Sequence, residues 1–279
     1  MPSSKNTKVF ILSLGFIEND VAMNLLLHNQ ATASDKNKPA DWHRVPSICL
    51  LIDHPKLGRV LVDTGSNPKA MEGYWPEETC QRTPLIRTRE DMLDYRLREL
   101  NISPKEIDLV ILTHMHLDHA GGLCYFENTK AGEKVIVHED ELKQASYESV
   151  LSGGRLSEGY MLSDFFGLKG IKYDPIIDST ALADDLEIIW LPGHTPGITG
   201  ILIHLEKTGT IFYTSDAVNS AANIYPETTL SASSYNSFQV MNSTNRIRWL
   251  QRRYNATLIY GHDMNQFKKL KLSPNQFYD

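Results

Sequence analysis

Cysteine is scarce in this chain, and its three residues, Cys49, Cys80 and Cys124, are far apart in the sequence. An odd number of widely spaced cysteines forms neither a disulfide framework nor a thiolate zinc site, which needs pairs such as C-x-x-C. Cys49 and Cys124 stand beside apolar residues, so we interpret them as small buried hydrophobic side chains. Cysteine usage of this kind is typical of the reducing cytoplasm, and we expect a cytoplasmic protein.

Long hydrophobic runs and an excess of basic residues are also missing. The longest apolar stretches, such as residues 9–17, are far below the roughly 20 residues that a membrane-spanning helix requires. The 28 lysine and arginine residues are outnumbered by 34 acidic ones, which gives a formal net charge of −6. Because nucleic acids and anionic membranes are bound by basic surfaces, we expect neither as a partner. The 279 residues, 41% of them hydrophobic, suit one globular domain over residues 1–279.

Short runs rich in β-branched residues recur along the chain and predict strands. Helical patterns lie between them: a capping box at Thr88 and Asp91 begins one helix, residues 139–150 form a second and residues 247–254 mark a third. Strands in both halves of the chain favour two packed sheets covered by helices over one parallel sheet. The predicted strands are residues 8–14, 48–53, 59–63, 108–113, 134–138, 186–191, 198–205, 210–214 and 257–260.

Two segments, residues 18–46 and 151–180, hold scattered apolar residues without a clear period. Long stretches of this kind in a compact domain are typical of functional loops or of elements that a pattern fails to reveal. We expect them to contribute walls to a binding site or to pack against the sheets.

A dense group of metal-ligand residues follows the predicted strand that ends at residue 113. His114, His116, Asp118 and His119 fall within six residues. In an extended segment, residues two apart point the same way, so His114 and His116 can bind one ion while Asp118 and His119 face a second position. Imidazole and carboxylate groups are ligands that divalent metals such as zinc prefer. The glycines at 121 and 122 allow another part of the backbone to approach closely.

Three more ligand-type residues stand at the ends of later strands. His194 lies in a proline and glycine turn at residues 191–197, Asp216 follows the strand at 210–214, and His262 follows the last strand. Four ligands from one loop cannot complete two metal sites, so these three residues are the candidates for the remaining positions. A glycine or serine precedes each of them, which is typical of a crowded turn.

The order H-x-H-x-D-H, then a lone His, a lone Asp and a final His, resembles the metallo-β-lactamase superfamily. Within it, the turn at residues 62–65, the Pro-Gly-His-Thr-Pro-Gly turn and the terminal Gly-His-Asp resemble the N-acyl homoserine lactonase branch. The resemblance extends from about residue 8 to the C-terminus. It implies an α/β fold, an αββα sandwich of two mixed β-sheets flanked by helices, with metals at one sheet edge.

The resemblance also implies a role for each candidate residue. Asp216 would bridge two divalent ions, which we expect to be Zn²⁺, and Asp63 would orient a ligating imidazole. A turn-capping role for Asp63 beside Thr64 stays open. One metal would be bound by His114, His116 and His194, and the other by Asp118, His119 and His262.

The implied activity is that of a dinuclear-metal hydrolase that opens lactones, above all N-acyl homoserine lactones, the reaction of quorum quenching. A hydroxide shared by the metals would attack the ring carbonyl, and Asp118 would carry the proton to the leaving alkoxide. Another lactone, an ester or a thioester could be cleaved at the same centre, and a non-catalytic metal-binding sensor is a further alternative. The partner would be a small-molecule lactone. The metal, the acyl length and assembly as a homodimer stay open.

Substrate contacts are expected from the two segments without a clear period and from the region after Asp216. Leu25, Phe165 and Phe166 are candidates for the walls of an acyl groove, or else pack against the sheets. Asn219 stands where several lactonases of the family carry a tyrosine that binds the substrate carbonyl, and Tyr225 could supply that hydroxyl. The remaining histidines are interpreted as surface or structural residues, with His43 singled out because it lies in the unassigned segment: His28, His43, His54, His138 and His204.

Overall fold

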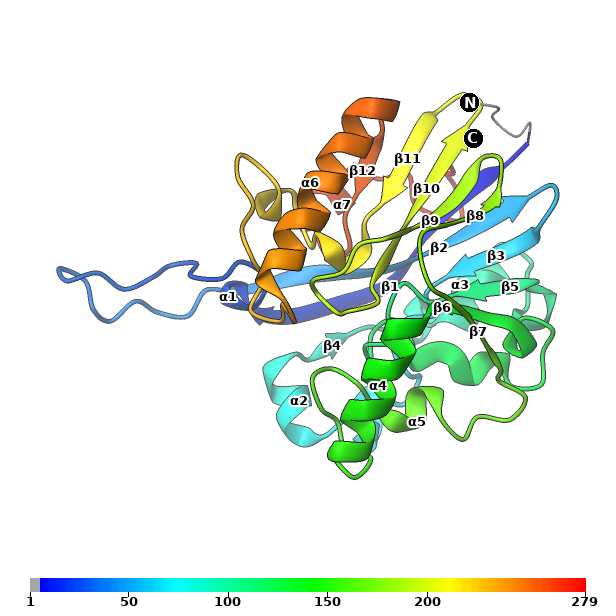
Figure 1. Ribbon diagram of the computed structural model, residues 1–279. Helices are drawn as coiled ribbons and strands as arrows, with labels where there is room; N and C mark the ends of the chain where they lie inside the picture. The colour runs from blue at the N-terminus through cyan, green and yellow to red at the C-terminus, as the bar shows by residue number, and fades with distance from the viewer. Residues whose placement is uncertain (1–5) are drawn as a thin grey trace.

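Two β-sheets pack face to face, and helices cover the outer face of each sheet (Figure 1). The computed structural model describes residues 6–279. The larger sheet has seven strands in the order β4-β1-β2-β3-β5-β6-β7, and the smaller has five in the order β12-β11-β10-β9-β8. This arrangement confirms the predicted αββα sandwich.

All of the strands predicted from β-branched runs are present. Three further strands, β4, β7 and β8, are short and lie at sheet edges. The strand bounds are β1 (Lys8–Asp20), β2 (Trp42–His54), β3 (Gly58–Val62), β4 (Leu85–Ile86), β5 (Leu109–Ile111), β6 (Val135–His138), β7 (Tyr173–Ile176), β8 (Thr180–Ala183), β9 (Leu186–Trp190), β10 (Thr199–Leu205), β11 (Gly209–Tyr213) and β12 (Thr257–Ile259).

Both sheets are mixed. Strands β1, β2 and β3 pair antiparallel, whereas β3, β5, β6 and β7 pair parallel. In the smaller sheet β8 to β11 are antiparallel and β12 is parallel to β11. Parallel neighbours need crossover connections, which helices provide. The helices are α1 (Val21–Asn24), α2 (Glu77–Arg82), α3 (Leu93–Glu99), α4 (Glu139–Leu151), α5 (Leu162–Phe165), α6 (Ser237–Tyr254) and α7 (Met264–Phe267).

Alternating apolar residues hold the two sheets together. Val9 and Ile11 of β1 face Ile201 and Ile203 of β10 in one core cluster, and all four side chains are fully buried. Strand β10 is buried along its whole length because α6 covers its other face. A third cluster lies between the larger sheet and the helices α3, α4 and α5.

The predicted helices are confirmed with small differences at their ends. Helix α4 spans the predicted 139–150 region, and α6 buries Ile247 and Leu250 as expected. The capping box of Thr88 and Asp91 is present, but it begins a short 3₁₀ turn that precedes α3. Among residues 6–279, no helix is long and apolar enough to cross a membrane.

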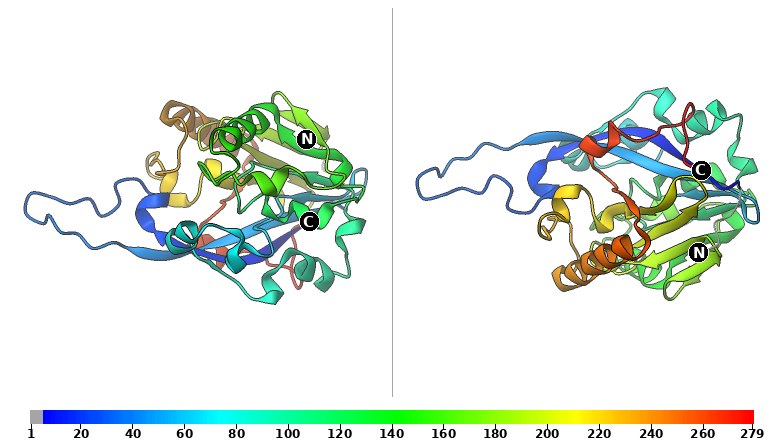
Figure 2. Two further views of the ribbon diagram at one scale, coloured as in Figure 1. Left: turned by 90° about the horizontal axis from the view of Figure 1, so that it is seen from below. Right: turned by 90° about the horizontal axis from the view of Figure 1, so that it is seen from above.

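The segment at residues 18–46 contains more regular structure than its sequence pattern indicates. Strand β1 continues to Asp20 and β2 begins at Trp42, with Asn19 paired opposite His43. Residues 25–41 connect α1 to β2 and extend away from the body of the molecule (Figure 2). The two long paired strands therefore carry polar residues of this segment to the end of the sandwich where β5, β11 and β12 finish.

Candidate metal centre and active site

The seven predicted metal ligands come together at one end of the sandwich. They follow strands β5, β9, β11 and β12, whose carboxyl ends meet there. Within each group, potential ligand atoms from all members lie within 4.8 Å of one another. The groups are His114, His116 and His194; His114, His119 and Asp216; and Asp118, His119 and His262.

Three imidazoles form the first group. Nε2 of His194 lies 3.1 Å from Nδ1 of His116, and the ring centres of His114 and His116 are 4.6 Å apart. Burial, reinforced by the neighbouring imidazoles, holds the pKa of His114 well below its usual range. The ring is therefore neutral at physiological pH, which is the form that binds a metal.

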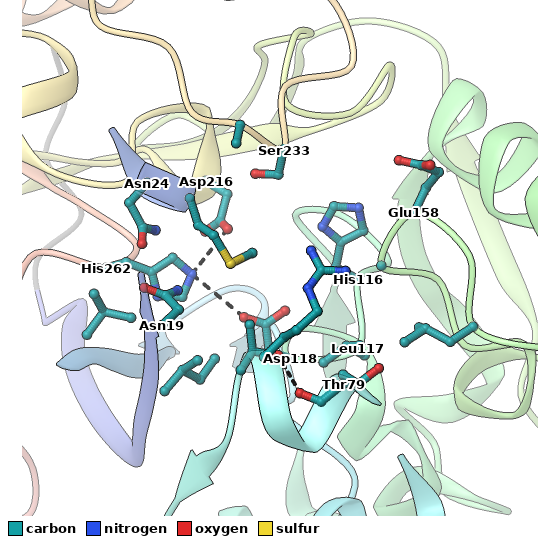
Figure 3. A pocket seen from close by; sticks show the side chains of 18 of the residues that line it. Asn19, Asn24, Thr79, His116, Leu117, Asp118, Glu158, Asp216, Ser233 and His262 are labelled. Atoms are coloured by element: carbon teal, nitrogen blue, oxygen red, sulfur yellow. Dashed lines mark hydrogen bonds and ion pairs between the residues drawn. The ribbon is translucent and has the colours of Figure 1, made fainter. Parts of the chain in front are cut away.

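Asp216 lies between the two halves of the cluster. Its Oδ2 is 3.1 Å from Nε2 of His262 and 3.7 Å from Nε2 of His194, and its Oδ1 is 3.4 Å from Nε2 of His119. Asp118 completes the second half, with Oδ2 at 3.7 Å from Nε2 of His262 (Figure 3). One carboxylate within reach of both halves is the arrangement that a bridging ligand requires.

The donor atoms fit divalent cations. Nε2 of His114, Nε2 of His119 and Oδ1 of Asp216 are buried and have no hydrogen-bond partner in the described part of the chain. An unpaired buried polar atom costs about 1–3 kcal/mol, and a bound cation would satisfy all three. Burial alone would lower the pKa of His119, but three nearby carboxylates, including Asp118 and Asp63, raise it well above the usual range. The same negative potential attracts metal ions.

Other groups fix the orientation of the imidazoles. Oδ2 of Asp63 lies 2.9 Å from Nδ1 of His119, and the backbone N–H of Thr113 donates to Oδ1 of Asp63 at 2.7 Å. Nδ1 of His262 lies 2.9 Å from the carbonyl oxygen of Pro46. In each ring the Nδ1–H is engaged, so Nε2 is free to face the cluster. The Asp63 carboxylate thus contacts an imidazole, and its other partner is Thr113 at the end of β5 rather than a group in its own turn.

Small residues are required where the ligand loops cross. A Cβ added to Gly122 would lie 2.2 Å from the carbonyl oxygen of Thr64, and one added to Gly261 would lie 2.5 Å from Oδ1 of Asp216. Ser215, directly before Asp216, has a φ of +46°, a conformation that few residues adopt. These contacts confirm the expected crowding behind the ligands.

Glu141, in the first turn of α4, is a residue of the site that sequence reasoning missed. Its side chain is fully buried and accepts four hydrogen bonds. Oε1 accepts from the backbone N–H of Met115 and the hydroxyl of Tyr160, and Oε2 accepts from the hydroxyl of Thr195 and the N–H of Gly197. Because Met115 and Thr195 are neighbours of ligands, this carboxylate links the two histidine loops.

A cavity of about 660 Å³ opens over the cluster. Apolar residues from β1, β2 and the loop before α2 form one wall, and polar residues from several loops complete it. Both segments without a clear sequence period contribute, but through residues that were not predicted. The walls comprise Ile17, Asn19, Met23, Asn24, Val45, Trp75, Pro76, Glu78, Thr79, Arg82, Thr83, Leu117, Leu156, Ser157, Glu158, Gly159, Asn219, Ala232 and Ser233, together with cluster residues.

None of the three apolar side chains predicted to line an acyl groove belongs to this cavity. Phe165 is packed in the core beneath the larger sheet, Phe166 is 71% exposed on the surface, and Leu25 lies outside the lining. The assignment of Leu25, Phe165 and Phe166 to the groove is therefore corrected. Phe165 is the last residue of α5, whereas the backbone of Phe166 is already extended, so one phenylalanine is buried and the next is exposed.

The two candidates after Asp216 have different positions. Asn219 lines the cavity, and its backbone carbonyl accepts a hydrogen bond from the N–H of His262. Tyr225 lies outside the cavity lining, and its hydroxyl donates to Gln251 on α6. The geometry thus keeps Asn219 as a candidate substrate contact and removes Tyr225.

Four of the other histidines have structural partners, whereas His43 contacts residues of the cavity wall. His54 pairs with buried Asp185 at 2.9 Å, and the rings of His138 and Trp190 stack. His204 is hydrogen-bonded to a threonine and His28 to an exposed aspartate, as expected of structural residues. His43 instead contacts two asparagines that line the cavity.

Comparison with known proteins places this geometry in a family. The family model described as the metallo-beta-lactamase superfamily matches residues 44–262. The chain belongs to the metallo-β-lactamase superfamily. It is 30% identical to the N-acyl homoserine lactonase AiiB of Agrobacterium fabrum, with 98% of this chain and 99% of that protein covered. An N-acyl homoserine lactonase of Bacillus cereus is 27% identical over 85% of the chain. The resemblance seen in the sequence, to the superfamily and to its lactonase branch, is confirmed.

Solved structures of similar proteins share the fold. An N-acyl homoserine lactone hydrolase with the product N-hexanoyl-L-homoserine at its metal centre superposes with a TM-score of 0.81, at 23% identity and with both chains fully covered. AidC, a dizinc quorum-quenching lactonase, gives a TM-score of 0.64 at 18% identity, covering 94% of this chain and 89% of its own. Both comparisons support the sandwich architecture described above.

Proposed function

We propose that the chain acts as a single hydrolase domain that opens the ring of N-acyl homoserine lactones, the quorum-quenching reaction, with two divalent metal ions, most naturally Zn²⁺. The observation that carries the proposal is the set of three ligand groups, linked by shared histidines and by the central carboxylate of Asp216, at the base of the cavity. The names of the curated relatives support the same substrate class.

Each half of the cluster would hold one metal ion. His114, His116 and His194 surround the first position, Asp118, His119 and His262 the second, and Asp216 reaches both. Bound divalent cations would supply Lewis acidity and lower the pKa of water toward about 7. The protein's part is to hold the imidazole nitrogens and carboxylate oxygens in place and to aim them at one point.

Asp118 is the residue placed to move a proton. Its side chain lines the cavity, and its Oδ2 lies 3.6 Å from Nε2 of His119 and 3.7 Å from Nε2 of His262. From this position it can accept the proton of the attacking water and donate it to the ring oxygen that leaves. Asn219, on the same wall, offers an amide N–H to the carbonyl oxygen of the lactone.

The test is product analysis with zinc-loaded protein and N-hexanoyl-L-homoserine lactone. Ring opening yields one product heavier than the substrate by one water, with the amide intact. Asp118→Asn keeps an oxygen that can face the second metal position but cannot accept the proton, so it should lose most of the rate when it is compared with the wild-type protein at equal metal content. Release of free homoserine lactone would mean amide cleavage, and preferential cleavage of a thioester or aryl ester would move the assignment to another hydrolase of the superfamily.

A further inference from the structure

Two asparagine amides lie on the cavity wall beside His262 (Figure 3). Asn19 is at the end of β1 and is 5% exposed, and Asn24 is at the end of α1. Both belong to the segment that the sequence left unassigned, and neither is a candidate ligand in the metal cluster.

His43 holds both amides in one orientation. Its Nε2 lies 2.8 Å from Oδ1 of Asn19 and 3.1 Å from Oδ1 of Asn24. If Nε2 carried no hydrogen, three acceptors would face one another, so the Nε2–H donates to both oxygens. His43 is opposite Asn19 in the β1–β2 ladder, and this pairing fixes the imidazole beneath the amides.

The backbone of the segment is fixed as well. Nδ2 of Asn223 donates to the carbonyl oxygen of Asn24 at 2.7 Å, and the carboxylate of Asp20 caps α1 by accepting from the N–H of Ala22. The two amides are therefore organised before any ligand binds, which reduces the entropy cost of binding.

With both oxygens engaged by His43, the amide donors are left to face a ligand. Within residues 6–279, Nδ2 of Asn19 and Nδ2 of Asn24 have no protein acceptor in hydrogen-bond contact. Outside the proposed metal ligands, the cavity is lined by two carboxylates, those of Glu78 and Glu158, and one guanidinium, that of Arg82, so its walls offer no excess of positive charge for an anionic ligand group. The chemistry that suits a pair of neutral N–H donors is a neutral carbonyl oxygen.

The distance from the cluster suits an oxygen outside the lactone ring. Pro46, whose carbonyl oxygen contacts His262, lies three residues after His43, the partner of Asn19 along β2. At roughly 3.4 Å per residue, Asn19 lies about 10 Å along the strand from that contact, and Asn24 follows on α1. Their side chains lie beside His262 in the same cavity (Figure 3), where they could meet the acyl group of a lactone whose ring lies over the cluster.

We propose that Asn19 and Asn24, positioned by His43, bind a carbonyl oxygen of the N-acyl group and so select N-acyl homoserine lactones over lactones that lack it. This inference rests on the proposed function and adds the residues that recognise the acyl group of the substrate. The oxygen is that of the acyl amide or of a 3-oxo substituent. Both are neutral carbonyl oxygens, and substrates with and without the 3-oxo group distinguish them.

The experiment compares matched substrates on matched variants. N-hexanoyl-L-homoserine lactone carries the amide carbonyl, its 3-oxohexanoyl analogue carries a second one, and α-heptyl-γ-butyrolactone has the same ring and chain length with neither. Asn19→Leu, Asn24→Leu and the double variant remove the donors at nearly constant volume. Asn245→Leu, at an exposed asparagine on α6 outside the cavity, is the control. Metal content is measured for every variant.

We expect each single substitution to lower kcat/KM for the acyl substrate about three- to tenfold, and the double variant about ten- to a hundredfold, as loss of neutral hydrogen bonds predicts. The loss should lie in KM, because the acyl group is bound equally in the ground and transition states. Activity on the alkyl lactone should change less than about twofold. His43→Leu should give the same selective rise in KM, because it frees the amides to rotate.

A loss with both acyl substrates would identify the amide carbonyl, and a loss with the 3-oxo substrate alone would identify the 3-oxo oxygen. Equal losses on all three lactones, or no loss on any, would overturn the inference. A protein that opens no lactone would refute the proposed function. The role of the two asparagines could then still be tested by the binding of N-cyclopentylhexanamide, measured by calorimetry. The double variant should bind that amide about tenfold more weakly, and unchanged binding would overturn the role of the asparagines.

Discussion

Replacing Glu141 should loosen the two loops that carry the first histidine group. The buried carboxylate accepts hydrogen bonds from four donors on three segments of the chain. In Glu141→Gln the new amide nitrogen faces two of these donors and can accept from neither. Each buried donor left unpaired costs about 1–3 kcal/mol, which sets the gross penalty at about 2–6 kcal/mol.

A part of this penalty is offset. Burial raises the pKa of Glu141, which shows that the ionised form is held at a cost, and a neutral amide avoids that cost. We therefore expect Glu141→Gln to lower the free energy of unfolding by about 2–4 kcal/mol, a large share of the 5–15 kcal/mol typical of a domain. Tyr160→Phe, which removes a single donor to the same carboxylate, should cost about 1 kcal/mol.

Two assays separate stability from metal binding. Denaturant unfolding with metal present and after chelation gives the free energies, and competition with a coloured chelator gives the affinity of each metal site. Glu141→Gln should weaken the site of His114, His116 and His194 more than the site of His262. A variant with native stability and native affinity at both sites would refute the linking role of Glu141.

Three further outcomes are expected. Burial raises the pKa of Asp164 to about 7, above its value in the unfolded chain. Between about pH 4 and pH 7 the folded protein therefore keeps a proton that the unfolded chain has lost. The free energy of unfolding should fall across this range as the pH rises, by up to about 4 kcal/mol. Asp164→Asn should remove this slope from urea-unfolding curves, and an unchanged slope would contradict it. Tyr225→Phe should change kcat less than about tenfold, since its hydroxyl contacts Gln251 outside the cavity. A hundredfold loss of kcat at constant metal content would show that Tyr225 takes part in the reaction. Gly261→Ala should lower the metal content measured by plasma mass spectrometry, because its Cβ would lie 2.5 Å from Oδ1 of Asp216. An unchanged metal content would show that the loop can move to accommodate the methyl group.

The core strands were predictable because they are long and rich in β-branched residues. Strand β10 is apolar on both faces, and its bounds differ from the predicted ones by a single residue at the start. The edge strands β4, β7 and β8 were missed, since two to four residues with one polar side give no usable period. Pro175 within β7 further weakens its pattern and is tolerated because the strand lies at an edge.

The clustering of the seven candidate ligands was predictable because four of them are concentrated in the sequence and the other three follow strands that finish at the same end of the sandwich. Glu141 gave no such signal: it stands beside Glu139 and Asp140 in the first turn of a helix, where acidic residues are usually solvent-exposed. Only the long-range packing of α4 against the two histidine loops distinguishes it.

The cavity walls depend on how loops are placed, which local sequence does not determine. Phe165 and Phe166 have the same chemistry, yet one fills the core and the other is exposed. Asn19 and Asn24 gain their role from His43 on a neighbouring strand, a contact that requires the β1–β2 register. Residues that act through distant partners therefore escaped prediction, whereas the clustering of the predicted histidines and aspartates did not.

The most direct test of the metal-dependent lactonase assignment is to titrate zinc into chelated protein while following proton release from N-hexanoyl-L-homoserine lactone. The rate should rise from zero and reach its plateau at two zinc ions per chain, one for each half of the cluster around Asp216. Full hydrolysis by protein shown to be free of metal would contradict the account.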